Sequence, residues 1–199
     1  MTDSLKFGFI VLCFIIALVS YFFCHSKKDW RYLATAMGFT AVSDYYLVLV
    51  NIHRIGLFTF CFVHMIYILR VSENKKKSIQ RILITVLAGV LLYVLFFDIV
   101  LIPIAIVYAA LFVQNLAAHI KYYRNGEALP GINRGIMLIG LILFALCDIN
   151  VLMFNLPRFI EFPQELANLG HRLIWFFYGP SQLLLGVSAW RFGARRRPL

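Results

Sequence analysis

The sequence predicts an all-α membrane protein, in which residues 1–199 form one integral membrane domain of seven transmembrane helices. Three observations support this fold class. The chain is 62% hydrophobic and only 14% charged, whereas soluble domains have roughly 45–50% apolar and about 25% charged residues. Its apolar residues gather in runs close to the roughly 20 residues that a membrane-spanning helix needs. Its basic residues lie mostly between those runs.

Seven spans account for the apolar runs. The run from Ile82 to Ala118 is too long for one helix, so we divide it between Asp98, as a turn residue, and Pro103, in the first turn of the next helix. The first span is long enough to cross a membrane, and we expect it to remain rather than to be cleaved as a signal peptide. The third is short, which allows a partly re-entrant segment. The spans cover residues 5–24, 32–50, 55–69, 82–97, 99–118, 135–154 and 173–190.

This division separates the 19 Lys and Arg residues unequally. Four lie on one side of the spans, and the other fifteen lie on the opposite side. Because cytoplasmic loops carry the excess of Lys and Arg, we expect the N-terminus outside the cell membrane and the C-terminus, with Arg195 to Arg197, in the cytoplasm. The same placement explains the net charge of +10 without a nucleic-acid partner. The four outer residues are Lys6, Arg54, Arg158 and Arg172.

Two aspartates, Asp44 and Asp148, are the only acidic residues within the spans. A carboxylate in hydrocarbon costs several kcal/mol unless it is paired or neutralised, so each marks a candidate functional site. Both lie six residues before the outer end of an outward-running span, which places them about 9 Å below the outer boundary. Asn51 and Asn155 follow the two aspartates at equal spacing, a pattern that hints at a duplicated unit.

Six further polar residues lie in the spans near this level or below it. Such residues often form hydrogen bonds between transmembrane helices without any chemical role, so a structural and a functional interpretation both stay open. The sequence Tyr178-Gly179-Pro180 predicts a kink that frees backbone groups near a cavity. The six residues are His64, Tyr67, Tyr108, Asn115, Tyr178 and Gln182.

Metal and disulfide chemistry are not expected. His64 and the two aspartates are a weak zinc candidate, because metal sites usually bring a tighter set such as two His on one helical face. We therefore expect no metal and no cofactor. The cysteines lie in or at the ends of apolar runs without CxxC spacing, as packing residues do. They are Cys13, Cys24, Cys61 and Cys147.

The longest outer loop is expected between Asn155 and Arg172. Its stretch FIEFPQELANL mixes apolar and polar residues, which is typical of an amphipathic segment in the membrane interface. An ordinary loop packed against the bundle explains the same pattern equally well. Arg158 and Arg172, at the outer mouth, are candidates to bind a phosphate group, with ordinary loop charges as the alternative.

Five stretches in this order resemble the YhhN-like membrane protein family, whose characterised members are lysoplasmalogenases. The resemblance covers roughly residues 32–190. The chain departs from the family pattern before each aspartate. Family members have Gly before the first aspartate, where this chain has Ser43, and Ser before the second, where this chain has Cys147. Typical members resemble eight-span proteins with an extra helix near the N-terminus. The stretches are AVSDYYLVL, FVHMIYILR, IAIVYAALFVQNLAA, LFALCDINVLM and WFFYGPSQLLL.

The resemblance implies a hydrolase that cleaves the vinyl ether of lysoplasmalogen, a lysophospholipid of the membrane, into a fatty aldehyde and a glycerophospho-alcohol. Asp44 and Asp148 would be the catalytic carboxyls, one as acid and the other as base or cation stabiliser, with His64 orienting an aspartate or the water. The candidate substrate-binding residues are Tyr67, Tyr108, Asn115, Tyr178 and Gln182. Two alternatives stay open: a lipid-handling protein or proton-coupled transporter with the aspartates as relay, and a seven-helix sensor.

Overall fold

A computed structural model of the chain describes residues 2–95 and 100–192, so Asp98 and Arg195 to Arg197 lie outside the described residues. Over the described ranges the chain forms seven α-helices and no strand, which confirms the all-helical fold and the number of helices. The helices are α1 (Asp3–Val19), α2 (Lys27–Asp44), α3 (His53–Val71), α4 (Lys75–Leu95), α5 (Leu101–Asn125), α6 (Gly131–Asn155) and α7 (Gln164–Val187).

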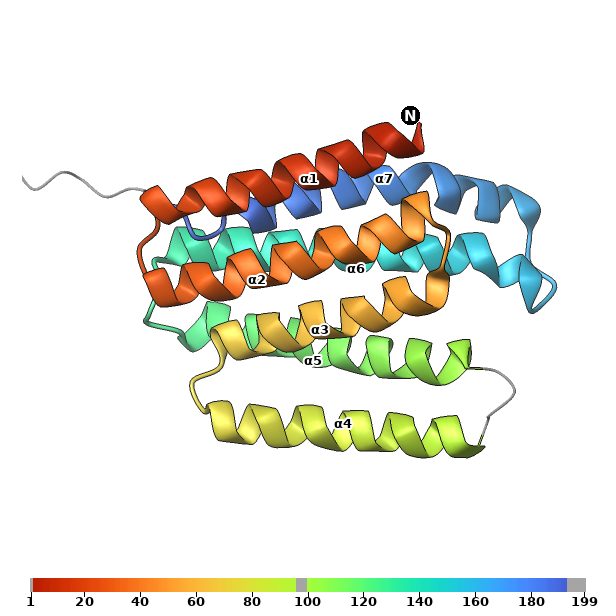
Figure 1. Cartoon of the computed structure of the whole chain (residues 1–199), viewed down its shortest axis with the longest axis horizontal. Coiled ribbons are helices and arrows are strands. Elements are labelled where there is room, and N and C mark those ends of the chain that lie inside the picture. Colours follow the sequence, from red (N-terminus) through yellow and green to blue (C-terminus); the bar gives the residue numbers. More distant parts are fainter. Residues whose placement is uncertain (1, 96–99, 193–199) are drawn as a thin grey trace, which may run out of the picture.

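The helices lie side by side with their long axes roughly parallel, in two layers (Figure 1). Helices α1, α2 and α3 form one layer, and α7, α6 and α5 form the other. Contacts of α1 with α7 and of α3 with α5 join the layers, while α4 packs at the edge against α5 and α3. The main core therefore lies between the two layers, and it contains side chains of both.

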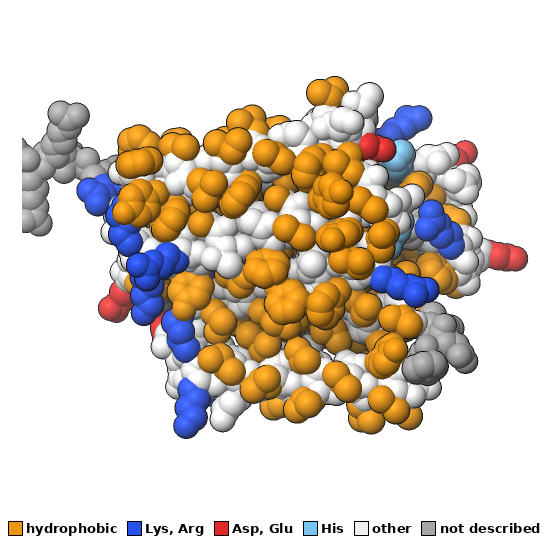
Figure 2. Space-filling model, viewed as in Figure 1, with side chains coloured by type: hydrophobic (Ala, Val, Ile, Leu, Met, Phe, Trp, Pro, Cys, Tyr) orange, Lys and Arg blue, Asp and Glu red, His pale blue; other side chains and the backbone are white. Residues whose placement is uncertain are grey.

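Five helices are long and apolar enough to cross a membrane, which makes the chain a membrane protein: α1, α3, α4, α5 and α6. Hydrophobic side chains cover the middle of the molecule, and most Lys and Arg side chains gather at the end where α2 and α4 begin (Figure 2). Helices α2 and α7 are more polar and lie between other helices. That all seven cross the membrane, with the N-terminus outside, stays a prediction.

Several helices extend beyond the spans expected from hydropathy. Helix α4 begins at Lys75 rather than near Ile82, and α7 begins at Gln164 rather than near residue 173. The stretch Gln164–Arg172 is therefore the start of α7, and neither a separate interfacial segment nor a loop. Helix α3 is 19 residues long and continuous, and therefore longer than the span of residues 55–69 expected from hydropathy. Hydropathy marks only the apolar part of a helix, whereas hydrogen bonding continues through its polar first turns.

The end of α2 has an unusual backbone. A π-helical turn, Tyr45–Leu49, follows directly on Asp44, and the Val50 N–H donates to the Tyr45 carbonyl at 3.1 Å. Asn51 then adopts a left-handed conformation with φ 60°, which asparagine tolerates better than most residues. Asn155, by contrast, is the last residue of α6 and is helical. The two asparagines thus differ in conformation, and their shared spacing does not mark a repeated structure.

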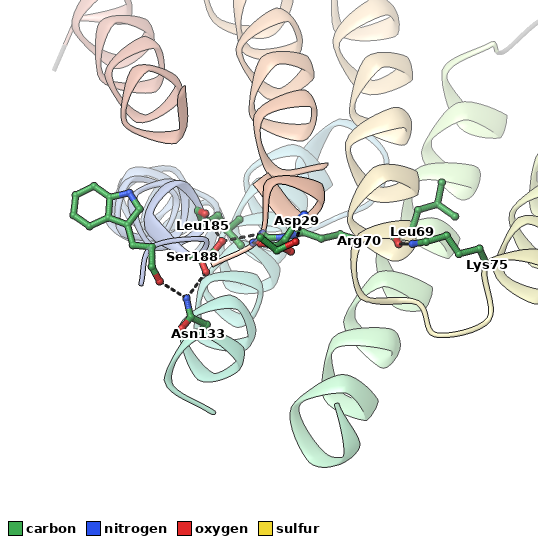
Figure 3. A network of polar contacts seen from close by, with 9 residues as sticks. Asp29, Leu69, Arg70, Lys75, Asn133, Leu185 and Ser188 are labelled. Atoms are coloured by element: carbon green, nitrogen blue, oxygen red, sulfur yellow. Dashed lines mark hydrogen bonds and ion pairs between the residues drawn. The ribbon is translucent and has the colours of Figure 1, made fainter. Parts of the chain in front are cut away.

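A buried ion pair holds four helices together at the end where α2 begins (Figure 3). Arg70 of α3 donates from Nε and Nη2 to the two carboxylate oxygens of Asp29 of α2, each at 2.8 Å. Its Nη1 donates to Ser188 Oγ after α7, also at 2.8 Å, and Asn133 of α6 donates to the Ser188 carbonyl at 2.8 Å. Paired in this way, the charge of Arg70 can stay buried.

Small residues bring α6 and α7 into close contact. Ser181 of α7 donates to the Gly140 carbonyl of α6 at 2.8 Å. A Cβ atom added at Gly170 would lie 2.9 Å from the Asn150 carbonyl oxygen and 3.1 Å from Met153 Cβ. Transmembrane helices pack through such small residues because lipid supplies no hydrophobic force between them.

Gly170→Ala tests this close contact. The new methyl group would press on the α6 backbone, so we expect the free energy of unfolding to fall by about 1–3 kcal/mol. Gly8→Ala is the control, because nothing lies within 4 Å of a Cβ at that position. Thermal or denaturant unfolding of both variants in detergent measures the difference, and equal stabilities would contradict the close α6–α7 contact.

Arg70→Met tests the ion pair. The change strands the Asp29 carboxylate, whose side chain is only 11% exposed, so the free energy of unfolding should fall by about 3 kcal/mol. Lys121→Met is the matched control, because Lys121 and Glu73 form an exposed pair at 3.8 Å and such pairs contribute about 0–1 kcal/mol. A similar small effect of both variants in the same unfolding assay would refute the role given to Arg70.

Candidate active site

The first carboxyl group, on Asp44, lies where α2 passes into its π-helical turn. Its side chain is buried, and the phenol of Tyr178 on α7 donates a hydrogen bond to Oδ2. The preceding Ser43 donates from Oγ to the Phe39 carbonyl at 2.8 Å and lies 2.7 Å from Thr59 Oγ1 of α3. Helices α3 and α7 therefore both fix the position of this end of α2.

The second carboxyl group, on Asp148, lies within α6. Tyr108 of α5 donates from its hydroxyl to Asp148 Oδ2 at 2.6 Å. Asp148 is half-buried, whereas Asp44 is only 3% exposed. Two helix pairs, α2 with α7 and α5 with α6, thus each contain one carboxyl–phenol hydrogen bond.

An aromatic cluster connects the two carboxyl–phenol pairs. Phe144 of α6 is at its centre, with its ring centroid 5.6 Å from those of Tyr178, His64 and Phe112. The His64 ring also lies 4.9 Å from that of Tyr108, edge to face. The aromatic cluster consists of Phe60, His64, Tyr108, Phe112, Phe144 and Tyr178.

His64 is buried in this cluster, and it forms no hydrogen bond with either aspartate among the described residues. Its Nδ1 lies 3.2 Å from the side-chain nitrogen of Asn115 on α5, and its Nε2 has no partner there. The imidazole ring lies against the ring of Tyr108, whose hydroxyl donates to Asp148. That His64 orients an aspartate or the water stays a prediction.

The other predicted residues lie on the opposite side of the cluster from the carboxyls. The Tyr67 hydroxyl contacts Met37 Sδ at 3.5 Å, and its ring lies 6.2 Å from that of His119. Gln182, one turn after Tyr178 on α7, is fully buried, and neither atom of its amide has a partner in the part of the chain that the structure describes. These residues line the interior rather than the surface.

Three residues of the site had no signal in the sequence. Phe144 and Phe112 are two of 19 phenylalanines, and nothing in their spacing separates them from lipid-facing ones. His119, which is 2% exposed, lies near the end of α5, where a polar residue is ordinary. In residues 2–95 and 100–192, no three His, Cys, Asp or Glu side chains come together in a group that could hold a metal ion.

The fold and the site define a helical membrane protein with two carboxyl–phenol pairs around a buried aromatic cluster. The family description "YhhN family" matches residues 5–189, and the chain belongs to this family. The match covers all seven helices almost to their ends and confirms the resemblance found in the motifs. No curated protein matches the chain, and no solved structure does.

Tyr178→Phe tests the first carboxyl–phenol pair. The variant keeps the aromatic ring but removes the donor to Asp44, so we expect the free energy of unfolding to fall by about 1–3 kcal/mol. Tyr45→Phe is the control, because Tyr45 lies next to Asp44 in sequence but is 45% exposed. Denaturant unfolding in detergent compares the two, and a loss no larger than that of the control would contradict the stabilising role of the hydrogen bond.

Proposed function

We propose that this protein is a lysoplasmalogenase-like ether hydrolase, which cleaves the vinyl ether bond of a lysoplasmalogen to a fatty aldehyde and a glycerophospho-alcohol. Its family is associated with this activity. The proposal is supported by the two carboxyl groups, Asp44 and Asp148. Each accepts a hydrogen bond from one phenol, and both phenols belong to one aromatic cluster.

The chemistry of a vinyl ether suits such a pair. Protonation of the alkene carbon distal to oxygen by one carboxylic acid produces an oxocarbenium ion. Water then adds to the carbon next to oxygen and loses a proton to a carboxylate, which gives a hemiacetal. The hemiacetal collapses to the aldehyde and the alcohol, so one water is consumed. Glycosidases use two carboxyls for the same kind of cation.

The surroundings of the carboxyls favour a mechanism in which one carboxyl donates a proton and the other accepts one. Burial away from water favours the neutral form of a carboxyl group, as a proton donor requires. The rings of Phe144 and Phe112 contact the two phenols, Tyr178 and Tyr108 respectively, and aromatic rings attract cations to their faces. Apolar and aromatic surroundings of this kind suit a hydrocarbon chain better than a polar substrate. We assign catalytic roles to Asp44 and Asp148 without ordering them as acid and base.

The test is aldehyde release from lysoplasmalogen by the purified full-length protein. Asp44→Asn and Asp148→Asn preserve side-chain shape but cannot transfer the proton, so each should lower the rate by about 100-fold or more. Asp3→Asn is the matched control, because Asp3 is exposed at the start of α1, where it pairs with Lys6, and it should retain full activity.

Full activity in either Asp44→Asn or Asp148→Asn would refute the two-carboxyl mechanism. Absence of aldehyde from the wild type, together with a proton-coupled flux in proteoliposomes that both variants abolish, would support the transporter instead. Thermal unfolding of each variant separates loss of chemistry from loss of folding.

A further inference from the structure

Buried polar side chains continue from the aromatic cluster toward the end of the bundle where α2 begins. On α3 and α5 they follow one another at intervals of three or four residues, which places them on one face of each helix. Helices α3 and α5 pack against each other. We call this set the polar stripe. It consists of His64, Tyr67 and Arg70 on α3, Asn115, His119 and Tyr122 on α5, and Gln182 on α7, each at most 8% exposed.

Several members of the polar stripe contact one another. At the end near the carboxyls, His64 lies against Tyr108, the residue that donates to Asp148. Asn115 contacts His64 at 3.2 Å, and the next turn brings His119 and Tyr67 together with ring centroids 6.2 Å apart. At the end where α2 begins, Arg70 and Tyr122 line an open pocket of about 380 Å³, beside Asp29 and Lys75.

Within the described residues, five buried atoms of the polar stripe lack a hydrogen-bond partner: His64 Nε2, Asn115 Oδ1, His119 Nε2, and Nε2 and Oε1 of Gln182. Their chemistry can be assigned. His64 Nδ1 accepts from the Asn115 amide, so the hydrogen of that ring sits on Nε2 as a donor. His119 Nδ1 lies 3.0 Å from the Asn115 carbonyl oxygen and must donate, so its Nε2 is an acceptor.

Unpaired donors and acceptors in a protein interior are costly, at about 1–3 kcal/mol each. The polar stripe contains both kinds, and burial favours the neutral form of its two imidazoles. An ion would satisfy only one kind, whereas water both donates and accepts. Buried waters in proteins occupy sites of this type, where they bond to about three otherwise unsatisfied polar groups.

We propose that the polar stripe holds a file of water molecules that connects the pocket beside Arg70 with the surroundings of Asp148. Water enters the file at the end of the bundle that is rich in Lys and Arg. The ligand of the polar stripe is therefore neutral water. If the proposed hydrolysis is correct, this file supplies the water that the reaction consumes, while the lipid reaches the carboxyls from the membrane. That second statement alone rests on the proposed function.

Hydroxyl-radical labelling tests the water file without any substrate. Brief X-ray irradiation of the full-length protein in detergent makes radicals from bound water, and mass spectrometry locates the oxidised side chains. We expect Tyr67, which is 1% exposed, to be labelled several-fold faster than Cys61, which is 4% exposed in a separate apolar cluster of α3 to α5. The comparison is stringent because a thiol is intrinsically the more reactive group.

A variant locates the water along the polar stripe. His119→Leu removes an unpaired acceptor and fills its place with carbon, so labelling of Tyr67 should fall several-fold. Leu111→Met is the control on the same helix, because Leu111 is fully buried in the apolar cluster, and it should leave Tyr67 labelling unchanged. Mixing with heavy-oxygen water just before irradiation should transfer the heavy isotope to Tyr67 if the file exchanges with bulk water.

Labelling of wild-type Tyr67 no faster than that of Cys61 would overturn the proposal, even if His119→Leu fails to fold. Unchanged Tyr67 labelling in a folded His119→Leu variant would overturn the path through His119. Neither result depends on aldehyde release, so a dry polar stripe in an active enzyme refutes only the water file. A labelled polar stripe in a protein inactive toward lysoplasmalogen refutes only the proposed function.

Discussion

The fold depends on hydrogen bonds to two carboxyl groups that lie inside a bundle of largely apolar helices. A carboxyl group in that setting needs a hydrogen-bond partner from another helix, because neither lipid nor bulk water provides one. Tyr178 gives α7 a fixed register against α2 through Asp44, and Tyr108 does the same for α5 against α6 through Asp148. Phe144 packs against Tyr178 of the first pair and against His64, which contacts Tyr108 of the second.

This constraint explains which helices look least like membrane spans. Helices α2 and α7 fall short of the apolar composition of the other five, and they contribute Asp44, Tyr178 and Gln182 to the interior. Helix α4 has the opposite character, because it lies at the edge of the bundle and exposes most of its apolar side chains. The polar residues of α2 and α7 therefore face the interior of the bundle, whereas the apolar residues of α4 are mostly exposed at its edge.

The sequence predicted those features whose free energy depends on the local sequence alone. Asp44 and Asp148 stand out because a carboxyl in an apolar run is rare, and the helices stand out because their apolar lengths match a membrane. The partners of those groups were not predictable. Nothing local assigns Tyr178 to Asp44 rather than to Asp148, or Asp29 to Arg70, since these pairings depend on how helices far apart in sequence pack. The π-helical turn after Asp44 likewise has no signature in Tyr45–Leu49.

The two ends of the bundle cannot both bind the head group of the proposed substrate. Asn133, which belongs to the Arg70 network, and Asp148 lie fifteen residues apart on α6, or about 22 Å at the helical rise. A lysolipid has only a glycerol unit between its phosphate and its vinyl ether, which is far shorter. A phosphate in the pocket beside Arg70 would therefore leave the vinyl ether well short of the carboxyls. If the proposed hydrolysis is correct, the phosphate of the substrate extends toward the other end, where α6 ends before Arg158, and the pocket beside Arg70 is free to take up the proposed water.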